Sequence, residues 1–424
     1  MTELTQLIID TYKTREQLIQ NGIWGGELYK HVKIINNHDR SWIWKTLLLH
    51  SENQDDSNKD KKYITNDSFL FDSLDNLVPV PLLSPITKKN EDADQLQNTT
   101  LAFTPIKQIV KIGNKGIRKL TPKETHLHPL TNHEDEDDYG MNISDTLEII
   151  DLDLSRLIVS PIFQDPKVHA LMRQIMFNYL LLTNEDKQRK NIPIVDQIYR
   201  YRQGFHEILS IIFLQFYDSN LNNIEIKFIL FIFIKLMVPL QRTFYIEKNL
   251  LNWQNNYFIK LLKLSSPQIY SIFYPTTTNT NHTNLIWLIR WTRLLFLREL
   301  PIQDCLIVWD HILTFSYPVD SMVACIIIAI LITVRKNLIE IYQDNEMDND
   351  DLIEFMLQFD KHIKNLNILK ICELAGSLCE SWENGNWKDL SKIVTNYINQ
   401  NEMDPNRKRL EDKLKQRVQR SLNK

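Results

Sequence analysis

Hydrophobic residues recur at helical spacing along most of the chain. In segment 165–182 they fall three and four residues apart, which places them on one face of a helix. These residues are Val168, Leu171, Met172, Ile175, Tyr179 and Leu182. Segment 285–296 repeats the pattern and leaves Arg290 and Arg293 on the opposite side. Because no alternating strand pattern longer than a few residues stands out, the sequence predicts an all-α fold.

Some segments are apolar on every side. Segments 208–216 and 326–334 have this composition, which is typical of helices in the middle of a large core. Pro301 is expected to begin a further helix, since proline suits the first helical turn. The apolar runs at 228–240 and 322–334 each have about 13 residues, whereas a membrane-spanning helix needs about 20. We interpret both runs as buried core helices.

Composition divides the chain into four parts. An N-terminal helical part at 1–50 ends in the apolar cluster WIWKTLLL. From Ser51 onward, charged residues and prolines replace the helical pattern, which predicts a long insertion of little order at 51–125. A helical core is predicted at 126–400, followed by a basic amphipathic tail at 401–424.

The tail carries eight basic and two acidic residues from Asn406 onward. Leu410, Leu414, Val418 and Leu422 form one apolar stripe along it. Such a helix can lie on an anionic membrane surface or dock on a partner. It can equally pack its leucines on its own domain, and the sequence leaves both interpretations open.

Glycine content and charge exclude several classes of function. Only nine glycines occur in 424 residues, and neither G-x-G-x-x-G nor G-x-x-x-x-G-K-[ST] is present, so the chain is not expected to bind a nucleotide phosphate by itself. The net charge of −4 provides no attraction to nucleic acid. The four cysteines form no C-x-x-C pair, and the N-terminus has no apolar signal segment, so we expect a reduced, cytosolic setting.

The histidines, serines and cysteines of the sequence do not indicate a metal site or a catalytic nucleophile. His126, His128 and His133 lie close together beside five acidic residues, but a segment of little order does not hold metal ligands in fixed geometry, so no metal site is predicted. His206 and His311 have apolar neighbours and are interpreted as structural. No serine or cysteine has the glycine-flanked setting of a nucleophile elbow.

Five short motifs follow one another in a fixed order. They are RSWIWKTLLL at 40–49, I-x-x-D-x-x-R at 150–156, Y-R-Q-G at 201–204, W-x-x-R-W-x-R-L-L-F-x-R-E at 287–299 and D-x-L-x-V-W-D at 304–310. This order resembles the TBC domain of Rab GTPase-activating proteins, over about residues 20–50 and 126–400. YRQGFHEIL looks most like the Y-R-Q-G-M-H-E branch and is similar to fungal members that act on Golgi Rabs. The chain departs from the family where Leu157–Ile158–Val159 replaces threonine, an aromatic residue and proline, and where Phe205 replaces methionine.

The resemblance implies a large helical domain that accelerates GTP hydrolysis by a Rab-family GTPase in vesicle trafficking. Such a protein is an enzyme activator and has no substrate of its own. By this resemblance Arg156 is the arginine finger and Gln203 is the glutamine finger. GTP and magnesium would arrive with the partner, so no cofactor is expected on this chain. A cytoplasmic protein is implied, peripheral at Golgi or endosomal membranes.

Other motif residues are expected to support the fingers. Asp153 and Arg156 are three residues apart, so on a helix they share a face, and Asp153 is expected to hold the guanidinium in place. Tyr201 and Gly204 are supporting residues, and the lack of a side chain at Gly204 would let a partner's backbone approach. Arg202 is expected at the interface or as a cap on a carbonyl group.

Further along the chain, four charged residues are expected to form a buried scaffold between helices. They are Arg290, Arg298, Asp304 and Asp310. Two alternatives to a catalytic activator stay open. One is a non-catalytic TBC-fold scaffold that binds a Rab or a coat or adaptor protein, and the other is a helical adaptor without any link to GTPases.

Overall fold

A computed structural model describes residues 3–31, 35–49, 143–185, 201–217, 223–275, 284–343 and 349–402. Within these ranges every regular element is helical and no strand occurs, so the prediction of an all-α fold is confirmed. The insertion predicted at 51–125 lies outside the described residues, as do the first residues of the core predicted at 126–400, with His126, His128 and His133, and all but the start of the tail.

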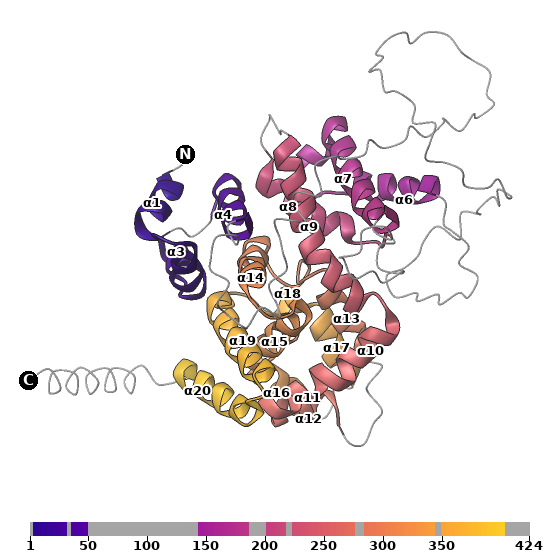
Figure 1. Ribbon diagram of the computed structural model, residues 1–424. Helices are drawn as coiled ribbons and strands as arrows, with labels where there is room; N and C mark the ends of the chain where they lie inside the picture. Colours follow the sequence, from indigo (N-terminus) through magenta and orange to yellow (C-terminus); the bar gives the residue numbers. More distant parts are fainter. Residues whose placement is uncertain are drawn as a thin grey trace, which may run out of the picture.

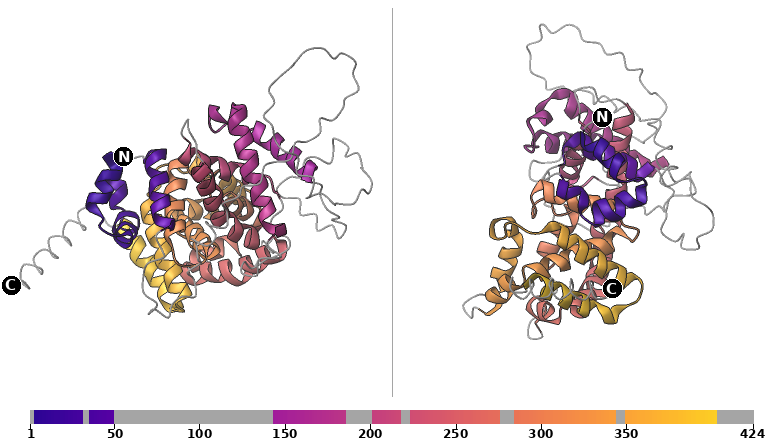
Figure 2. Two further views of the ribbon diagram at one scale, coloured as in Figure 1. Left: turned by 45° about the horizontal axis from the view of Figure 1, so that its top comes forward. Right: turned by 90° about the vertical axis from the view of Figure 1, so that its left-hand side faces the viewer.

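The N-terminal helices pack against the rest of the molecule. They are α1 (Glu3–Thr11), α2 (Arg15–Gln17), the π-helical turn η1 (Leu18–Trp24), α3 (Glu27–His31) and α4 (Asn37–Leu49). α4 lies against α8 and α14, and η1 lies against α14 and α19, as the indigo segments show (Figures 1 and 2). Trp44, from the apolar cluster predicted at the end of this part, is fully buried. The first fifty residues therefore contribute to the same core as the later helices.

The next group of helices carries the candidate fingers. It consists of α6 (Ile143–Ser155), the 3-10 turn η3 (Pro161–Gln164), α7 (Pro166–Glu185), α8 (Phe205–Phe216) and α9 (Asn223–Phe244). The apolar face predicted for 165–182 is found on α7, where Val168, Met172, Ile175 and Tyr179 are buried. α7 packs against α6, α8 and α9 (Figure 1).

The remaining helices build the lower part of the molecule in Figure 1. They are α10 (Glu247–Trp253), η4 (Gln254–Phe258), α11 (Ile259–Ser265), α12 (Pro267–Phe273), α13 (Leu285–Arg293), α14 (Ile302–Thr314), α15 (Val319–Thr333), α16 (Arg335–Gln343), α17 (Asn349–Leu357), α18 (Phe359–His362), α19 (Ile368–Glu383), η5 (Trp387–Asp389) and α20 (Leu390–Glu402). α15 is the central helix, because residues 321–332 are all buried and α15 packs against both α9 and α19.

The apolar runs at 228–240 and 322–334 fall on the core helices α9 and α15. Among the described residues no single helix is long and apolar enough to cross a membrane, although two bent pairs reach that length and composition together. These pairs are Glu225–Phe244 with Glu247–Ser265 and Val319–Thr333 with Arg335–Gln343. All four cysteines are buried free thiols.

The helix predicted at 285–296 ends earlier than expected, at Arg293. Leu295 and Phe296 have φ values of 50° and 68°, in the left-handed region that side chains rarely adopt. Two groups on α14 hold this backbone: Trp309 Nε1 donates to the Leu295 carbonyl at 3.1 Å, and the Cys305 thiol donates to the Phe296 carbonyl at 3.1 Å. The side chains of Leu295 and Phe296 are still buried, so the apolar pattern of the sequence continues beyond the end of the helix.

The polar side predicted for this helix is also wrong at Arg293, which is buried. Its Nε donates to the Phe244 carbonyl at 2.9 Å, and its guanidinium lies 4.9 Å from the ring centre of Tyr245. Tyr245 in turn donates to the Arg293 carbonyl at 3.0 Å. This buried arginine therefore joins α13 to the end of α9.

Candidate functional site

The two candidate fingers lie on adjoining segments. Arg156 directly follows α6, and Gln203 lies in the loop just before α8. Both side chains are exposed. The Tyr201 hydroxyl donates to Asp153 Oδ2 at 2.8 Å, which ties the loop to the last turns of α6. The structure thus brings together the I-x-x-D-x-x-R and Y-R-Q-G motifs.

Helix α6 separates its buried and exposed positions in a way that sets the direction of each motif residue. The buried stripe runs through Leu147, Ile150, Asp153 and Leu154 and continues to Leu157, just after the helix. The exposed stripe consists of Leu152, Ser155 and Arg156. Asp153 and Arg156 therefore point to different sides, although they are three residues apart.

The predicted ion pair between Asp153 and Arg156 is wrong in this structure. The Asp153 carboxylate is buried and accepts from Tyr201, while its backbone carbonyl accepts from the Arg156 amide at 3.2 Å. In the described part of the chain the Arg156 side chain makes no hydrogen bond or ion pair. Asp153 thus positions the neighbouring loop and leaves the guanidinium available to another molecule.

His206 completes the polar cluster beneath the fingers. Its Nδ1 lies 3.0 Å from the Tyr201 oxygen and 3.7 Å from Asp153 Oδ2. Burial lowers the pKa of His206 despite the opposing charge of Asp153, so the neutral imidazole is favoured. Because Tyr201 gives its proton to Asp153, Nδ1 must be the donor to the Tyr201 oxygen. The sequence identified His206 as structural but gave no sign of this contact.

Gly204 forms the turn between the finger loop and α8. Its φ is +104°, and its carbonyl accepts from the amide of Glu207 at 3.0 Å. A Cβ built here would lie 2.6 Å from Leu294 Cδ2. The backbone conformation and the contact with Leu294 therefore both require glycine at this position. The predicted approach of a partner would be a further reason. The neighbouring Arg202 is exposed, and its interface role stays a prediction.

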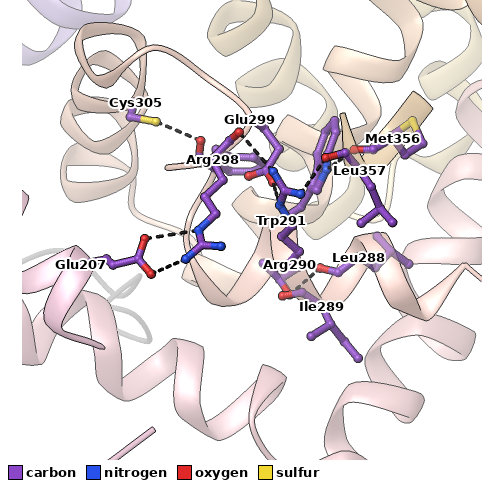
Figure 3. A network of polar contacts seen from close by, with 12 residues as sticks. Glu207, Leu288, Ile289, Arg290, Trp291, Arg298, Glu299, Cys305, Met356 and Leu357 are labelled. Atoms are coloured by element: carbon purple, nitrogen blue, oxygen red, sulfur yellow. Dashed lines mark hydrogen bonds and ion pairs between the residues drawn. The ribbon is translucent and has the colours of Figure 1, made fainter. Parts of the chain in front are cut away.

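A charged network fixes the first turn of α8 to the segment after α13, as Figure 3 shows. Arg298 donates to both carboxylate oxygens of Glu207, at 2.7 and 3.3 Å. Arg290 Nε lies 2.8 Å from Glu299 Oε1, and Arg290 Nη1 donates to the Leu357 carbonyl at 2.6 Å. Arg290 Nη2 also donates to the Arg298 carbonyl at 3.3 Å, so the network runs from α8, which follows the Gln203 loop, to α17.

The charged residues predicted as one buried scaffold divide into two kinds. Asp310 is buried, and the paired Arg290 is partly covered. Asp304 is half-buried like Arg290, whereas Arg298 is exposed, so the prediction of burial is wrong for Arg298. A helical pattern identifies the face of a helix but does not show how much of a long charged side chain reaches solvent.

Asp310 and Glu299 are two deeply buried acidic groups with different surroundings. Asp310 accepts from Arg40 at 3.1 Å, Trp44 at 2.7 Å and Tyr29 at 2.9 Å, all from the N-terminal helices. Burial raises the pKa of Glu299 to about 7, and the nearby Arg290 opposes this effect. Asp310 holds the N-terminal part in place, whereas Glu299 belongs to the network behind α8.

The arrangement defines an all-α domain with an exposed arginine and an exposed glutamine on adjoining segments. Within the described ranges no group of three histidine, cysteine, aspartate or glutamate side chains is placed to hold a metal ion. The family model of the Rab-GTPase-TBC domain, RabGAP-TBC, matches residues 110–339, and the chain belongs to this family. No curated protein matches the chain.

TBC domains act on Rab GTPases, so a Rab is the class of partner and GTPase activation is the general function.

Proposed function

We propose that the protein accelerates GTP hydrolysis by a Rab-family GTPase through Arg156 and Gln203 supplied in trans. The observation that carries the proposal is the exposure of both side chains on segments joined by the Tyr201–Asp153 hydrogen bond. An arginine supplied in trans neutralises charge on the transferring phosphoryl group and is worth roughly 10³–10⁵ in rate. Arginine suits this role because its fork donates in two directions and stays protonated.

Gln203 has the chemistry needed to position the attacking water. A neutral amide both accepts and donates hydrogen bonds without taking the proton. The loop that carries it is fixed at two points, by Tyr201 on one side and by the Gly204 turn on the other. Holding the segments that carry both fingers before the partner arrives reduces the entropy that must be lost in the complex.

The partner would bring the nucleotide and its magnesium ion, so the chain needs no cofactor of its own. We further propose that the partner is a Golgi Rab and that the protein acts in vesicle trafficking. It would act from the cytoplasm at Golgi or endosomal membranes, with the basic tail as a peripheral membrane contact. The support for this choice is the resemblance of YRQGFHEIL to fungal family members that act on Golgi Rabs.

Single-turnover GTP hydrolysis with a panel of purified, GTP-loaded Rabs tests the proposal. For the Rab that wild type stimulates most, Arg156→Ala should lose roughly 10³-fold or more of the stimulated rate, and Gln203→Ala should also lose most of it. Arg156→Lys should not restore the rate, because lysine lacks the planar fork. Lys260→Ala, which removes an exposed positive charge on α11, is the matched control and should match wild type.

Two results would contradict the proposal. Stimulated hydrolysis that is unchanged in Arg156→Ala would exclude the arginine finger. Binding of a GTP-loaded Rab by a wild-type protein that stimulates no member of the panel would instead assign a non-catalytic scaffold.

A further inference from the structure

An apolar rim flanks Arg156 along the chain, at the end of α6 and in the turn that follows. Of the ten large hydrophobic side chains that are exposed in the described part of the chain, three lie within eight residues here: Leu152, Ile158 and Val159. Ile158 is 93% exposed, whereas the other nine are between 36% and 54% exposed. A fully exposed isoleucine beside a candidate finger is costly to leave in water and indicates a surface that another molecule covers.

The turn that presents Ile158 and Val159 is fixed at both ends. Leu157 is buried, and its carbonyl accepts from Gln164 Nε2 at 3.0 Å. On the other side Phe163 is buried, and its amide donates to the Ser160 carbonyl at 3.2 Å. The chain therefore enters and leaves the core within a few residues and holds the two apolar side chains outward.

Leu152 lies on the same side. It is exposed in the last turn of α6, four residues before Arg156, which directly follows the helix. The guanidinium thus has an apolar side chain one turn before it and two more within three residues after it. A molecule that brings a phosphate to Arg156 would therefore meet exposed apolar side chains on the segments directly before and after it.

We infer that Leu152, Ile158 and Val159 form a docking surface for an apolar patch that flanks the nucleotide site of the GTP-loaded GTPase. This inference rests on the proposed function, because continuity with the finger identifies the occupant. Leu157–Ile158–Val159 is also where the chain departs from the family's usual threonine, aromatic residue and proline. The rim therefore selects partners whose surface beside the nucleotide is apolar.

The test is the dependence of the single-turnover rate on GTPase concentration, for the panel member most stimulated by wild type. Ile158→Asp should raise the half-saturating concentration by roughly tenfold to a hundredfold, as the loss of one buried isoleucine implies, while the rate at saturation stays within about twofold. Ile158→Leu should retain wild-type values. Leu264→Asp, at a 42% exposed leucine on α11, is the matched control and should change neither value.

The outcomes separate the rim from the finger. An unchanged half-saturating concentration in Ile158→Asp, with Arg156→Ala inactive, overturns the docking surface and leaves the proposed function standing. A fully active Arg156→Ala variant overturns the proposed function, and with it the inference. Binding of wild type but not Ile158→Asp to phosphatidylcholine vesicles, with unchanged kinetics, assigns the rim to lipid and overturns the inference. Equal melting temperatures of wild type and Ile158→Asp exclude misfolding as the cause of any change in the kinetics or in vesicle binding of this variant.

Discussion

The hydroxyl of Tyr201 lies 2.8 Å from Oδ2 of Asp153, and these residues are 48 positions apart in the chain. The hydrogen bond joins the helix that ends before Arg156 to the loop that carries Gln203. Its acceptor is a buried carboxylate that has little access to water. This phenol–carboxylate contact therefore helps to set the relative position of the two candidate fingers, and His206 supports it at 3.0 Å from the same hydroxyl.

Tyr201→Phe removes this contact and keeps the ring. We expect the free energy of unfolding to fall by about 1–2 kcal/mol, because Asp153 loses a hydrogen-bond donor in a buried site. The saturating rate of stimulated GTP hydrolysis should fall more than the affinity for the GTPase, since the loss affects alignment. Denaturant unfolding and single-turnover kinetics measure both effects. Tyr342→Phe, at an exposed position, is the control; equal kinetics in the two variants would contradict the positioning role.

Gly204→Ala should be strongly destabilising for two separate reasons. The φ of +104° is strained for any residue with a side chain, at about 1–2 kcal/mol. The new methyl group would also lie 2.6 Å from Leu294 Cδ2, an overpacking that costs about 1–3 kcal/mol. Denaturant unfolding should therefore show a loss of about 2–5 kcal/mol.

Gly385→Ala separates the two contributions. Its φ is +77°, but a Cβ there meets nothing within 4 Å, so only the backbone cost of about 1–2 kcal/mol is expected. Adding Leu294→Ala to Gly204→Ala should give a double variant more stable than the two single losses together imply. If the stability losses of Gly204→Ala and Leu294→Ala add exactly in the double variant, contact with Leu294 is not the reason that glycine is required at position 204.

Asp310→Ala tests whether the N-terminal helices belong to the domain. The change leaves Arg40, which is 1% exposed, as an unpaired buried charge and also removes the acceptor of Trp44. We expect the free energy of unfolding to fall by about 3–5 kcal/mol. Asp389→Ala breaks an exposed pair with Lys392 and should cost less than about 1 kcal/mol. Comparable losses in the two variants would contradict the role of Asp310.

The sequence predicts those parts of the fold where burial follows from local pattern. α7, α8 and α15 lie where apolar spacing placed them, because a long amphipathic or fully apolar helix has few ways to bury its side chains. The early end of α13 could not be predicted in this way. Leu295 and Phe296 continue the apolar pattern, and the groups that hold their left-handed backbone come from α14.

At the site, too, the sequence identified the segments involved but not the contacts between segments that are far apart in the chain. The resemblance to the family identified the segments of Arg156 and Gln203, and the structure shows that these segments adjoin. Spacing alone paired Asp153 with Arg156, because residues three apart can share a helix face. Asp153 instead belongs to the buried stripe of α6 and meets Tyr201, a contact between distant segments that helical spacing does not contain.

The buried carboxyl of Glu299 should make stability depend on pH in an unusual direction. Burial raises its pKa to about 7 from an ordinary value of 4.5. Between these values the folded protein holds a proton that the unfolded chain has released, so stability falls as pH rises. The contribution is fully present below about pH 4.5 and is lost by about pH 7. At about 1.36 kcal/mol for each pH unit, the loss is about 3 kcal/mol.

Glu299→Gln removes this titration and keeps the shape of the side chain. The free energy of unfolding of wild type relative to the variant should therefore decline by about 3 kcal/mol from pH 4.5 to 7.5 and then level off. Other titrating carboxyls cancel in this difference, which denaturant unfolding at a series of pH values measures. Glu340→Gln, at an exposed position on α16, should run parallel to wild type throughout. A difference between wild type and Glu299→Gln that rises with pH would mean that the ion pair with Arg290, at 2.8 Å, outweighs the cost of burying the charge.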